Sequence, residues 1–383
     1  MRYTHKREPA ILLIDNATVA RLITMPDCIR VQEAAFADIA SGRAIQRPRI
    51  DVYAPSVRED GYYRWSSMEG VTVRPGPYFA IRMKSDVVSW PRSPDGRQTE
   101  KKYSKQPGLY CGLVMVFSTE HGGPLALIND GVLQHKRVGA GAGIGAKYLA
   151  REDAAIVGVL GSGGMAKEYV RAFSAVRRIE RVRVFSPNPA NRERFAAEMA
   201  AELGIEVMPM PTAREAVAGA DIVATCTDSM QPVLDPDWLE PGMHVTNVAP
   251  TEVPRSCYER FDVIFRQGDA GGGAQALTPN PRLLREVGQS PIAYVAGTEE
   301  EMKRLPSPDP QRVGFGGDFP HIAELIHARL PGRTSADQIS FYHNFGHQGL
   351  QFACVGGLVV ERARAAGLGR ELPDEWFLQD VRN

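Results

Sequence analysis

The sequence predicts an α/β fold, with a Rossmann-type doubly wound parallel sheet and a second unit of the α+β kind. The chain has 383 residues, more than one compact core usually takes up, so two domains are expected. Between Ala154 and Pro250, short apolar segments alternate with helical ones, which is typical of a parallel sheet. One of these apolar segments ends in a glycine-rich turn that leads directly into a helix.

The first part of the chain has the pattern of a mixed α+β domain built on a sheet. An amphipathic helix is expected around residues 29–39. A polar loop between Ser89 and Gln106 is long for a compact domain, and loops of that size usually carry a function or move. Short apolar or alternating runs, separated by turns rich in Gly and Pro, predict strands at 11–14, 49–53, 78–84, 111–118 and 124–129.

The second part begins after about Lys136, where the small-residue run GAGAGIGAKYLA predicts a tightly packed helix. Further helices are expected from about Gly164, across 191–203 and near Arg214, and residues 321–367 also have a helical pattern. The strands between them are expected in the segments AAIVGVL, RVRVFS, IEVMPM, DIVATCT, HVTNVAP and FDVIFR.

The composition is that of an ordinary folded protein, with 43% hydrophobic and 23% charged residues. Lys+Arg and Asp+Glu both number 45, so no net charge attracts nucleic acid or an anionic membrane. No segment approaches the ~20 apolar residues that span a bilayer. The five cysteines are far apart and form no CxxC pair, which predicts reduced thiols. We expect a cytoplasmic protein that binds a small molecule in a local pocket, without nucleic acid or membrane partners.

The glycine-rich turn has the spacing of a dinucleotide-binding fingerprint, in the segment VGVLGSGGMAKEYV. Gly161 permits the tight turn, Gly163 lets the backbone approach a pyrophosphate, and Ala166 lets the helix pack closely on the strand. The phosphates are then expected on the amide groups at the helix start, at Gly164 and Met165. The alternative is a plain packing turn, but the strand, the helix and the next strand all fall where a nucleotide site requires them.

The end of the following strand indicates which dinucleotide is bound. Enzymes that prefer NAD usually have a carboxylate there, which accepts hydrogen bonds from the ribose 2′-hydroxyl. This chain has Ser186 and Asn188, with Arg192 and Arg194 close by. Arginine pairs well with a 2′-phosphate, so the cofactor is NADP or NAD, with NADP favoured. The alternative is that both arginines are merely solvated helix residues.

Two later strands are expected to flank the cofactor with their carboxyl ends. Ligands of open α/β sheets lie at this edge, beyond the last residues of the strands. Buried polar strand ends that bond only to neighbouring backbone are the competing interpretation. The residues expected at the cofactor are Thr225, Cys226, Thr227, Asn247 and Val248.

Taken in order, these segments resemble the ornithine cyclodeaminase/μ-crystallin family. The similarity runs from RPR at 47–49 and Lys84, through GLVMVFSTEHGGPLALINDGVLQHKR and the glycine turn, to EAVAGADIVATCT, PVLDPDWLEPGMHV and PGRTSADQISFYHNFG. The resemblance implies a homodimer whose first domain supplies the dimerising sheet and part of the substrate site, with the last helices folded back on it. The expected units are residues 1–137 with 340–383 for substrate binding and dimerisation, and 138–339 for NAD(P).

The resemblance also implies that Arg49, Lys84 and Arg137 gather over the nicotinamide as catalytic and substrate-binding residues. Arginine grips a carboxylate at two points, so the expected substrate is a small molecule with a carboxylate. Lys84 is expected to polarise or protonate a carbonyl, imine or amine nitrogen. Met68 is expected near the substrate, although methionine is more often simple core filling. Structural salt bridges are the alternative for the three cations.

The chain departs from the family pattern after HVTNVAP. Ornithine cyclodeaminases have an aspartate there for the distal amine of the substrate, whereas this chain has Thr251 followed by Glu252. A one-residue shift would let Glu252 bind substrate in its place. The loop between Ser89 and Gln106 is also unusual, and it is expected to remodel the substrate pocket through Trp90, Lys101, Lys102 and Lys105.

These features favour an NAD(P)-dependent oxidoreductase acting on a small imine or amino acid with a carboxylate, of the imino acid reductase or amino acid dehydrogenase type. One alternative is a cyclodeaminase-type lyase that releases ammonia and recycles its cofactor internally. Another is a non-catalytic NADP-dependent binding protein. No metal is expected, because His343 and His347 lack a nearby third ligand and are interpreted as structural.

Overall fold

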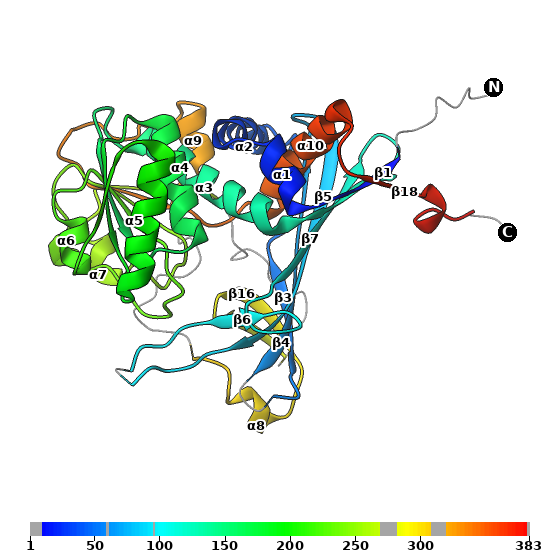
Figure 1. Cartoon of the computed structure of the whole chain (residues 1–383), viewed down its shortest axis with the longest axis horizontal. Coiled ribbons are helices and arrows are strands. Elements are labelled where there is room, and N and C mark those ends of the chain that lie inside the picture. The colour runs from blue at the N-terminus through cyan, green and yellow to red at the C-terminus, as the bar shows by residue number, and fades with distance from the viewer. Residues whose placement is uncertain (1–9, 59–60, 95, 269–281, 308–318, 381–383) are drawn as a thin grey trace.

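The computed structural model describes residues 10–58, 61–94, 96–268, 282–307 and 319–380, and in this part of the chain the strands form two sheets (Figure 1). One sheet has eleven strands, in the order β15-β16-β3-β4-β5-β7-β8-β1-β18 with β2 and β6 at its side. The other has seven, in the order β11-β10-β9-β12-β13-β17-β14. The predicted combination of a doubly wound parallel sheet with an α+β unit is confirmed.

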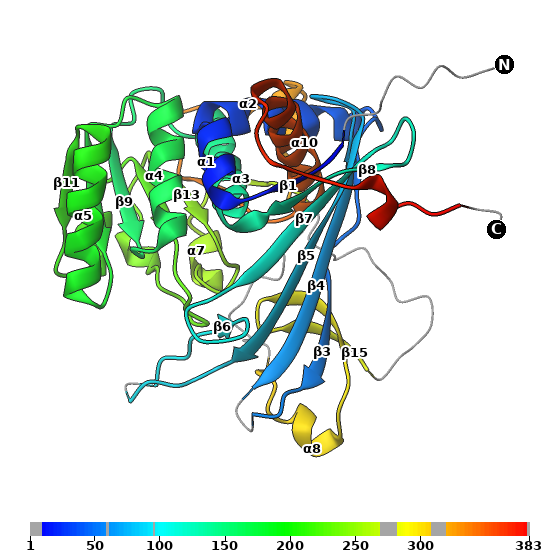
Figure 2. The same ribbon diagram turned by 45° about the vertical axis from the view of Figure 1, so that its right-hand side comes forward.

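The eleven-stranded sheet is built around two long strands, β4 and β5, on which residues alternate between a buried and a partly exposed face. Figure 2 shows these strands running from the helix-covered end of the sheet to the end that carries β15 and α8. The strands are β1 (Ile11–Ile14), β2 (Ile45–Gln46), β3 (Ile50–Pro55), β4 (Tyr62–Thr72), β5 (Tyr78–Ser89), β6 (Lys101–Tyr103), β7 (Cys111–Ser118), β8 (Pro124–Asn129), β15 (Leu283–Val287), β16 (Ser290–Val295) and β18 (Arg370–Leu372).

Helices α1 (Asn16–Leu22), α2 (Met25–Ala40) and α10 (Gln348–Ala366) pack together with the upper half of this sheet in one apolar core. The contact between α10 and β4 is close, because a Cβ atom on Gly70 or Gly349 would overlap the backbone of the other element. The last long helix therefore folds back onto the first sheet, as the family resemblance implies.

The seven-stranded sheet is parallel throughout. The chain runs outward from β9 to β11 on one side and restarts at β12 on the other, so the strand order reverses between β9 and β12. Open α/β sheets bind ligands at such a reversal. The strands are β9 (Ile156–Leu160), β10 (Arg181–Phe185), β11 (Glu206–Pro209), β12 (Ile222–Thr225), β13 (His244–Asn247), β14 (Val263–Arg266) and β17 (Ser340–His343).

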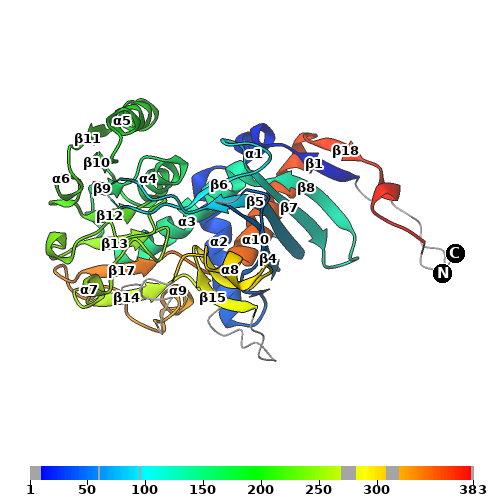
Figure 3. The same ribbon diagram turned by 90° about the horizontal axis from the view of Figure 1, so that it is seen from below.

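The remaining helices are short or cover the seven-stranded sheet, apart from α3, which lies between the two sheets (Figure 3). Close packing there requires glycine, since a Cβ atom on Gly139 would come within 2.6 Å of the Glu168 carbonyl oxygen of α4. These helices are α3 (Asp130–Leu149), α4 (Gly164–Val176), α5 (Pro189–Leu203), α6 (Ala213–Val217), α7 (Arg255–Tyr258), α8 (Glu299–Met302), α9 (Ile322–Ile326), η1 (Pro236–Trp238) and η2 (Asp374–Trp376).

The structure differs from the sequence prediction in three segments. β4 was not expected, and β17 lies in a region expected to be helical. β15 and β16 lie within 138–339 but belong to the first sheet, because β16 pairs with β3. Conversely, β17 lies within 340–383 but pairs with β13 and β14 of the parallel sheet.

Two further observations concern the cysteines and the length of the helices. All five cysteines are free, and four of them are buried while Cys111 is exposed. Among the helices that the structure describes, none is long and apolar enough to cross a membrane.

Candidate active site

A cavity of about 250 Å³ lies between the two sheets and receives side chains from both. Seven residues expected at the substrate or the cofactor line it, namely Arg49, Met68, Lys84, Arg137, Met165, Thr227 and Val248. This grouping joins residues that are up to 199 positions apart in the chain (Arg49 to Val248). It also joins the strand ends of the parallel sheet to the inner face of the other sheet.

The strand register explains why the polar side chains of the first sheet converge. Arg82, Lys84 and Asp86 alternate along β5, so they all point to the same face. Lys84 pairs with Ser66 on β4, and Arg64 is opposite Asp86 in the same ladder. The buried face of these two strands is therefore charged at its centre rather than apolar.

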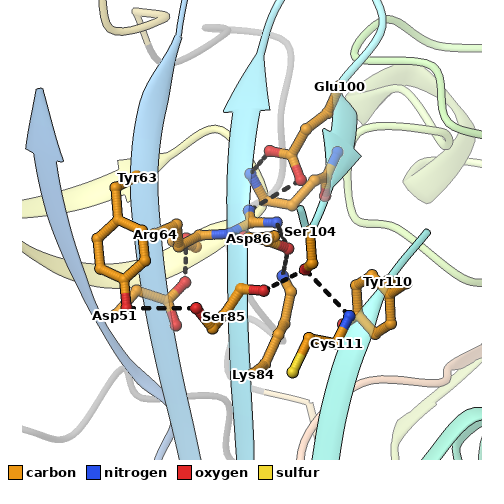
Figure 4. Close-up of polar contacts among 12 residues, drawn as sticks. Asp51, Tyr63, Arg64, Lys84, Ser85, Asp86, Glu100, Ser104, Tyr110 and Cys111 are labelled. Carbon is orange, nitrogen blue, oxygen red and sulfur yellow. Dashed lines mark hydrogen bonds and ion pairs between the residues drawn. The ribbon is translucent and has the colours of Figure 1, made fainter. Parts of the chain in front are cut away.

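Lys84 is held by a carboxylate that is itself held by an arginine (Figure 4). Its Nζ atom lies 2.9 Å from Asp86 Oδ2, and the Arg64 guanidinium donates two hydrogen bonds of 3.0 Å to the same carboxylate. Burial, and secondarily the charge of Arg64, lower the pKa of Lys84 well below its ordinary value, while Asp86 opposes the shift. A lysine with a lowered pKa gives up its proton more readily than a free lysine does, which suits it to proton transfer.

Arg49 lines the cavity but already has a carboxylate partner. Its Nε and Nη2 atoms donate to the two oxygens of Asp51, at 2.9 and 2.5 Å, and Nη1 donates to the Gln289 carbonyl at 3.3 Å. Asp51 is fully buried. The charge of Arg49 is therefore balanced within the protein, and this residue can contribute at most a neutralised hydrogen-bond donor to the cavity.

Arg137, in contrast to Arg49, has no carboxylate partner among the described residues. Among the described residues its guanidinium donates only to the side-chain oxygens of Gln134 and Gln351, at 2.7 to 3.2 Å, and it lies 4.9 Å from the centre of the Phe352 ring. It is 7% exposed. Burial, aided by the nearby charge of Arg82, lowers the pKa of Arg137 to about 9. A buried cation without a carboxylate partner is a strong binding site for an incoming anion.

Several lining residues were not predicted from the sequence, among them Arg82, Glu100 and Tyr110. Arg82 pairs with Asp130 at 2.6 Å and donates to the Tyr110 hydroxyl at 2.7 Å. Its position follows from the alternation of charged residues in RMKSD, a signal that the sequence does contain. Glu100 accepts from Arg64 at 2.9 Å, a pairing across 36 residues that no local pattern indicates.

The loop expected to remodel the pocket forms an arm, residues 90–106 apart from 95, that bridges the two sheets. Its Lys101–Tyr103 segment adds to β5, while Thr99 forms a β-bridge with Ser229 beyond the end of β12. Of its predicted side chains, Lys102 lines the cavity, whereas Lys101 pairs with Asp228 at 2.5 Å. The other two, Trp90 and the exposed Lys105, are not among the lining residues, although Trp90 donates to Glu100 at 3.3 Å.

The glycine turn has the geometry that a dinucleotide needs. Gly161 has a φ of 114°, and a Cβ atom there would overlap the Cys226 carbonyl, whereas the space around Gly163 is open. No side chain caps the start of α4, so the amides of its first turn face outward. A second cavity, of about 460 Å³, adjoins this turn and is lined in part by Gly161, Phe185 and Pro187. These residues fit a bound dinucleotide with its phosphates on α4.

The other residues expected at the cofactor lie along the same edge of the parallel sheet. Ser186 follows β10, and its carbonyl accepts from Arg192 at 2.9 Å, while Asn188 stands before α5 without a side-chain cap bond. Cys226 and Asn247 are buried at the ends of β12 and β13. This edge is the one at which the strand order reverses, where open α/β sheets bind ligands.

Glu252 differs from its expected role at a substrate amine. Its two oxygens accept five hydrogen bonds: the amides of Thr227, Val248 and Ala249 and the hydroxyls of Thr225 and Thr227, at 2.5 to 3.1 Å. It is fully buried and is not among the residues that line the cavity. A carboxylate with its acceptor sites filled by strand-end donors holds β12 and β13 together, and it has no free oxygen for an amine.

We predict that Glu252→Gln loosens this edge of the sheet. In the variant, the side-chain NH2 group of glutamine replaces one carboxylate oxygen, so it faces backbone and hydroxyl donors that lose their acceptor. This loss lowers the free energy of unfolding by about 1–3 kcal/mol. Binding of the dinucleotide should weaken as well, since Thr227 and Val248 line the cavity. Thermal unfolding and a fluorescence titration with NADPH measure both effects, with the exposed Glu259→Gln as control. Unchanged values for Glu252→Gln would contradict this role.

The two histidines considered as metal ligands lie in different elements. His343 is buried at the end of β17, and His347 precedes α10 with a φ of 53°. In the part of the chain that the structure describes, no group of three or more His, Cys, Asp or Glu side chains is placed to hold a metal ion.

Comparison with known proteins places this site in a family context. Residues 98–259 match the model of the ornithine cyclodeaminase/mu-crystallin family. The Delta(1)-pyrroline-2-carboxylate reductase of Bacillus cereus strain ZK / E33L is 34% identical over 362 residues, which cover 94% of this chain and 99% of that protein.

Solved structures have the same fold along most of the chain. The Delta(1)-pyrroline-2-carboxylate reductase of Thermococcus litoralis, in complex with NADH and L-proline, gives a TM-score of 0.71 at 23% identity, covering 94% of this chain and all of that one. An archaeal alanine dehydrogenase dimer with bound NAD gives 0.69 at 22% identity, covering 95% and 99%. The solved structures share the fold, and the family model together with the Bacillus cereus relative shows that the chain belongs to the ornithine cyclodeaminase/mu-crystallin family.

Proposed function

We propose that this protein is an NAD(P)-dependent oxidoreductase that interconverts a small imino acid and the corresponding amino acid. The observation that carries the proposal is the unpaired, buried guanidinium of Arg137 in the same cavity as Lys84, whose pKa burial lowers. One group suits a carboxylate and the other suits a proton transfer. The cavity also contains the cofactor-edge residues Met165 and Val248.

The substrate carboxylate binds to Arg137, which presents a planar pair of donors without a competing carboxylate. Arg49 borders the same cavity, but it is already neutralised by Asp51, so it shapes the site more than it adds charge. Holding the carboxylate in this way orients the reacting carbon–nitrogen bond toward the cofactor edge of the parallel sheet.

Lys84 transfers the proton. In the reductive direction its ammonium protonates the substrate nitrogen, and in the oxidative direction its neutral amine takes the proton back. Asp86 and Arg64 hold Lys84 in place through the chain of contacts that Figure 4 shows. The bound nicotinamide dinucleotide supplies or accepts the hydride.

NADP is the preferred cofactor in this proposal. No carboxylate follows β10 at Ser186 to Asn188, and Arg192 lies beside this strand end, with its guanidinium 5.9 Å from the centre of the Phe185 ring. We predict that Arg192→Ala raises the Kd for NADPH by about tenfold, the loss of one charge-assisted hydrogen bond, and leaves the Kd for NADH nearly unchanged. Titration with both cofactors measures this ratio. Equal effects on the two would contradict a 2′-phosphate contact.

The proposed activity is tested by the absorbance of NADPH and NADH in the presence of candidate substrates. The panel consists of 2-oxo acids with ammonium or methylamine, and of cyclic imino acids. Oxidation that requires both the protein and one panel member supports the reductase. No oxidation with any member, together with ammonia released from a diamino acid, would replace it by cyclodeaminase chemistry. Cofactor binding without turnover of any substrate would indicate a binding protein instead.

A homodimer formed by the eleven-stranded sheet belongs to the same proposal, with this sheet and α10 as the substrate-binding and dimerisation domain. The sheet face opposite α10 is apolar and only partly covered in the single chain. A solution mass near twice 42.0 kDa by light scattering is expected, and a mass of one chain would contradict it. The side chains of this face include Trp65, Phe79, Ile81, Met83, Leu113, Met115 and Phe117.

A further inference from the structure

The charges around the cavity do not cancel. Six cationic side chains belong to the cluster (Arg49, Arg64, Arg82, Lys84, Lys102 and Arg137), and the first four of these form ion pairs with Asp51, Asp86, Glu100 and Asp130. Four cations thus face four carboxylates, and a fifth lining carboxylate, Asp228, is paired with Lys101 of the arm. Among the described residues, the other two, Lys102 and Arg137, have no carboxylate within ion-pair distance, so the site keeps an excess of two positive charges.

Lys102 is available to a ligand. It stands opposite Val88 in the ladder between β6 and β5, and its side chain lines the cavity. In the described part of the structure its ammonium makes no ion pair or hydrogen bond. Glu100, a carboxylate whose charge raises the pKa of Lys102, already accepts hydrogen bonds from Arg64, from Trp90 and from the Gln289 amide.

The two unpaired cations lie on either side of Lys84. Arg137 and Arg82 both lie over the Phe352 ring, at 4.9 and 5.6 Å from its centre, so Arg137 is on the side of Lys84 where β5 begins. Lys102 lies opposite Val88, toward the other end of the strand. A molecule whose reacting atoms lie at Lys84 therefore has a cation on each side.

We propose that the substrate carries two carboxylates, so that the protein acts on a 2-imino or 2-amino dicarboxylic acid. The carboxylate next to the reacting carbon binds Arg137, and the side-chain carboxylate binds Lys102. This inference rests on the proposed function and adds the substrate class to it. Arg137 is a buried cation without a carboxylate partner, which is costly, whereas Lys102 is exposed to solvent and free to move toward a ligand. A dianion gives each of the two cations a partner.

The cofactor does not account for the second charge. Its phosphates are expected at the glycine turn, next to the larger cavity that includes Gly161 and Phe185. Lys102 is not among the residues that line that cavity. The smaller cavity, of about 250 Å³, suits a small molecule rather than a long side chain.

The test compares dicarboxylic substrates with monocarboxylic ones of equal chain length. Oxaloacetate is paired with 2-oxobutyrate, and 2-oxoglutarate with 2-oxovalerate, each with ammonium and the preferred cofactor. The native protein is expected to favour the dicarboxylic member by about tenfold or more in kcat/KM, the value of one charge-assisted hydrogen bond. Lys102→Gln should remove this preference, because it lowers kcat/KM for the dicarboxylic substrates more than for the monocarboxylic ones.

Two further variants keep the result interpretable. Lys105→Gln removes an exposed lysine of the same arm that does not line the cavity, and it should retain the full preference. Lys102→Arg retains the charge and should retain most of the preference. A native protein without a preference for dicarboxylates, or a Lys102→Gln variant that weakens both classes equally, would overturn the inference and leave the reductase activity standing.

A binding measurement separates this inference from the proposed function. Aspartate and alanine are titrated into the protein with bound NADPH, and the cofactor fluorescence is followed. Tighter binding of aspartate that Lys102→Gln abolishes supports the dicarboxylate site even if no panel member is turned over, which would by itself refute the proposed activity. Equal binding of the two amino acids would overturn the inference.

Discussion

Replacing Arg137 with methionine is expected to lower kcat/KM for the substrate by about 10²- to 10⁴-fold, the loss of two charge-assisted hydrogen bonds to a carboxylate. The same change should lower the free energy of unfolding by about 1–3 kcal/mol, because the buried side-chain oxygen of Gln351 loses its donor, although the cation that is removed has no carboxylate partner. Methionine fills a similar volume, so no large cavity forms. The variant is thus expected to lose most of its activity and to remain folded.

The matched control is Arg64→Met, which removes an arginine that is fully buried and paired with Asp86 and Glu100. Removing one partner of a buried ion pair typically costs about 3–5 kcal/mol, so this variant should unfold far more easily. Steady-state kinetics and denaturant unfolding of both variants make the comparison. Equal losses of stability, or full activity in Arg137→Met, would show that Arg137 is structural rather than a substrate ligand.

Replacing Lys84 with methionine is expected to lower kcat by about 10²- to 10⁴-fold, the usual contribution of a positioned proton donor. Binding of the dinucleotide should be retained, since the glycine turn and α4 do not involve this residue. The KM should change less than kcat, because Arg137 still holds the carboxylate. A variant that loses only substrate affinity would place Lys84 in binding and not in proton transfer.

The pH dependence gives a second readout for Lys84. Its pKa is lowered well below the ordinary value, so the ammonium loses its proton within a lower pH range than a free lysine does. Reduction needs the protonated form, so its rate should fall as the pH rises through this lowered pKa. Oxidation needs the neutral form, so its rate should rise over the same range. Both limbs should be absent in Lys84→Met.

The sequence predicted the parallel sheet well because its strands are apolar on both faces and are spaced by amphipathic helices. It did not reveal β4, although that strand is eleven residues long. The reason is that the buried face of β4 carries Arg64 and Ser66 where an ordinary strand carries apolar residues. The polar residues of the site therefore interrupt the alternation of apolar and polar residues by which a strand is recognised in a sequence.

The sequence predicted part of the candidate site. The ordered motifs indicated Arg49, Lys84 and Arg137, and the structure places all three around one cavity. Arg49 pairs with Asp51 because the two residues are two positions apart at the start of β3, where alternate side chains point to one face. Arg137 donates to the uncharged Gln351, 214 residues away in the chain, rather than to a carboxylate, and no local pattern reveals such a contact.

The positions of the lysines in the arm could not be predicted from the sequence either. Its length marked it as functional, and its lysines indicated an effect on the pocket. Which lysine enters the cavity depends on the antiparallel register that places Lys102 opposite Val88, and on the pairing of Lys101 with Asp228 of the other unit. Neither contact can be inferred without knowing how the two sheets are arranged.

The most direct test of hydride transfer to a substrate carbon uses NADPH carrying deuterium at the transferable position, with the best substrate of the panel and ammonium. The mass of the amino acid product is then measured. The account predicts one deuterium at the carbon next to the carboxylate, in amounts equal to the cofactor oxidised. An unlabelled product, or ammonia release without cofactor oxidation, would contradict it.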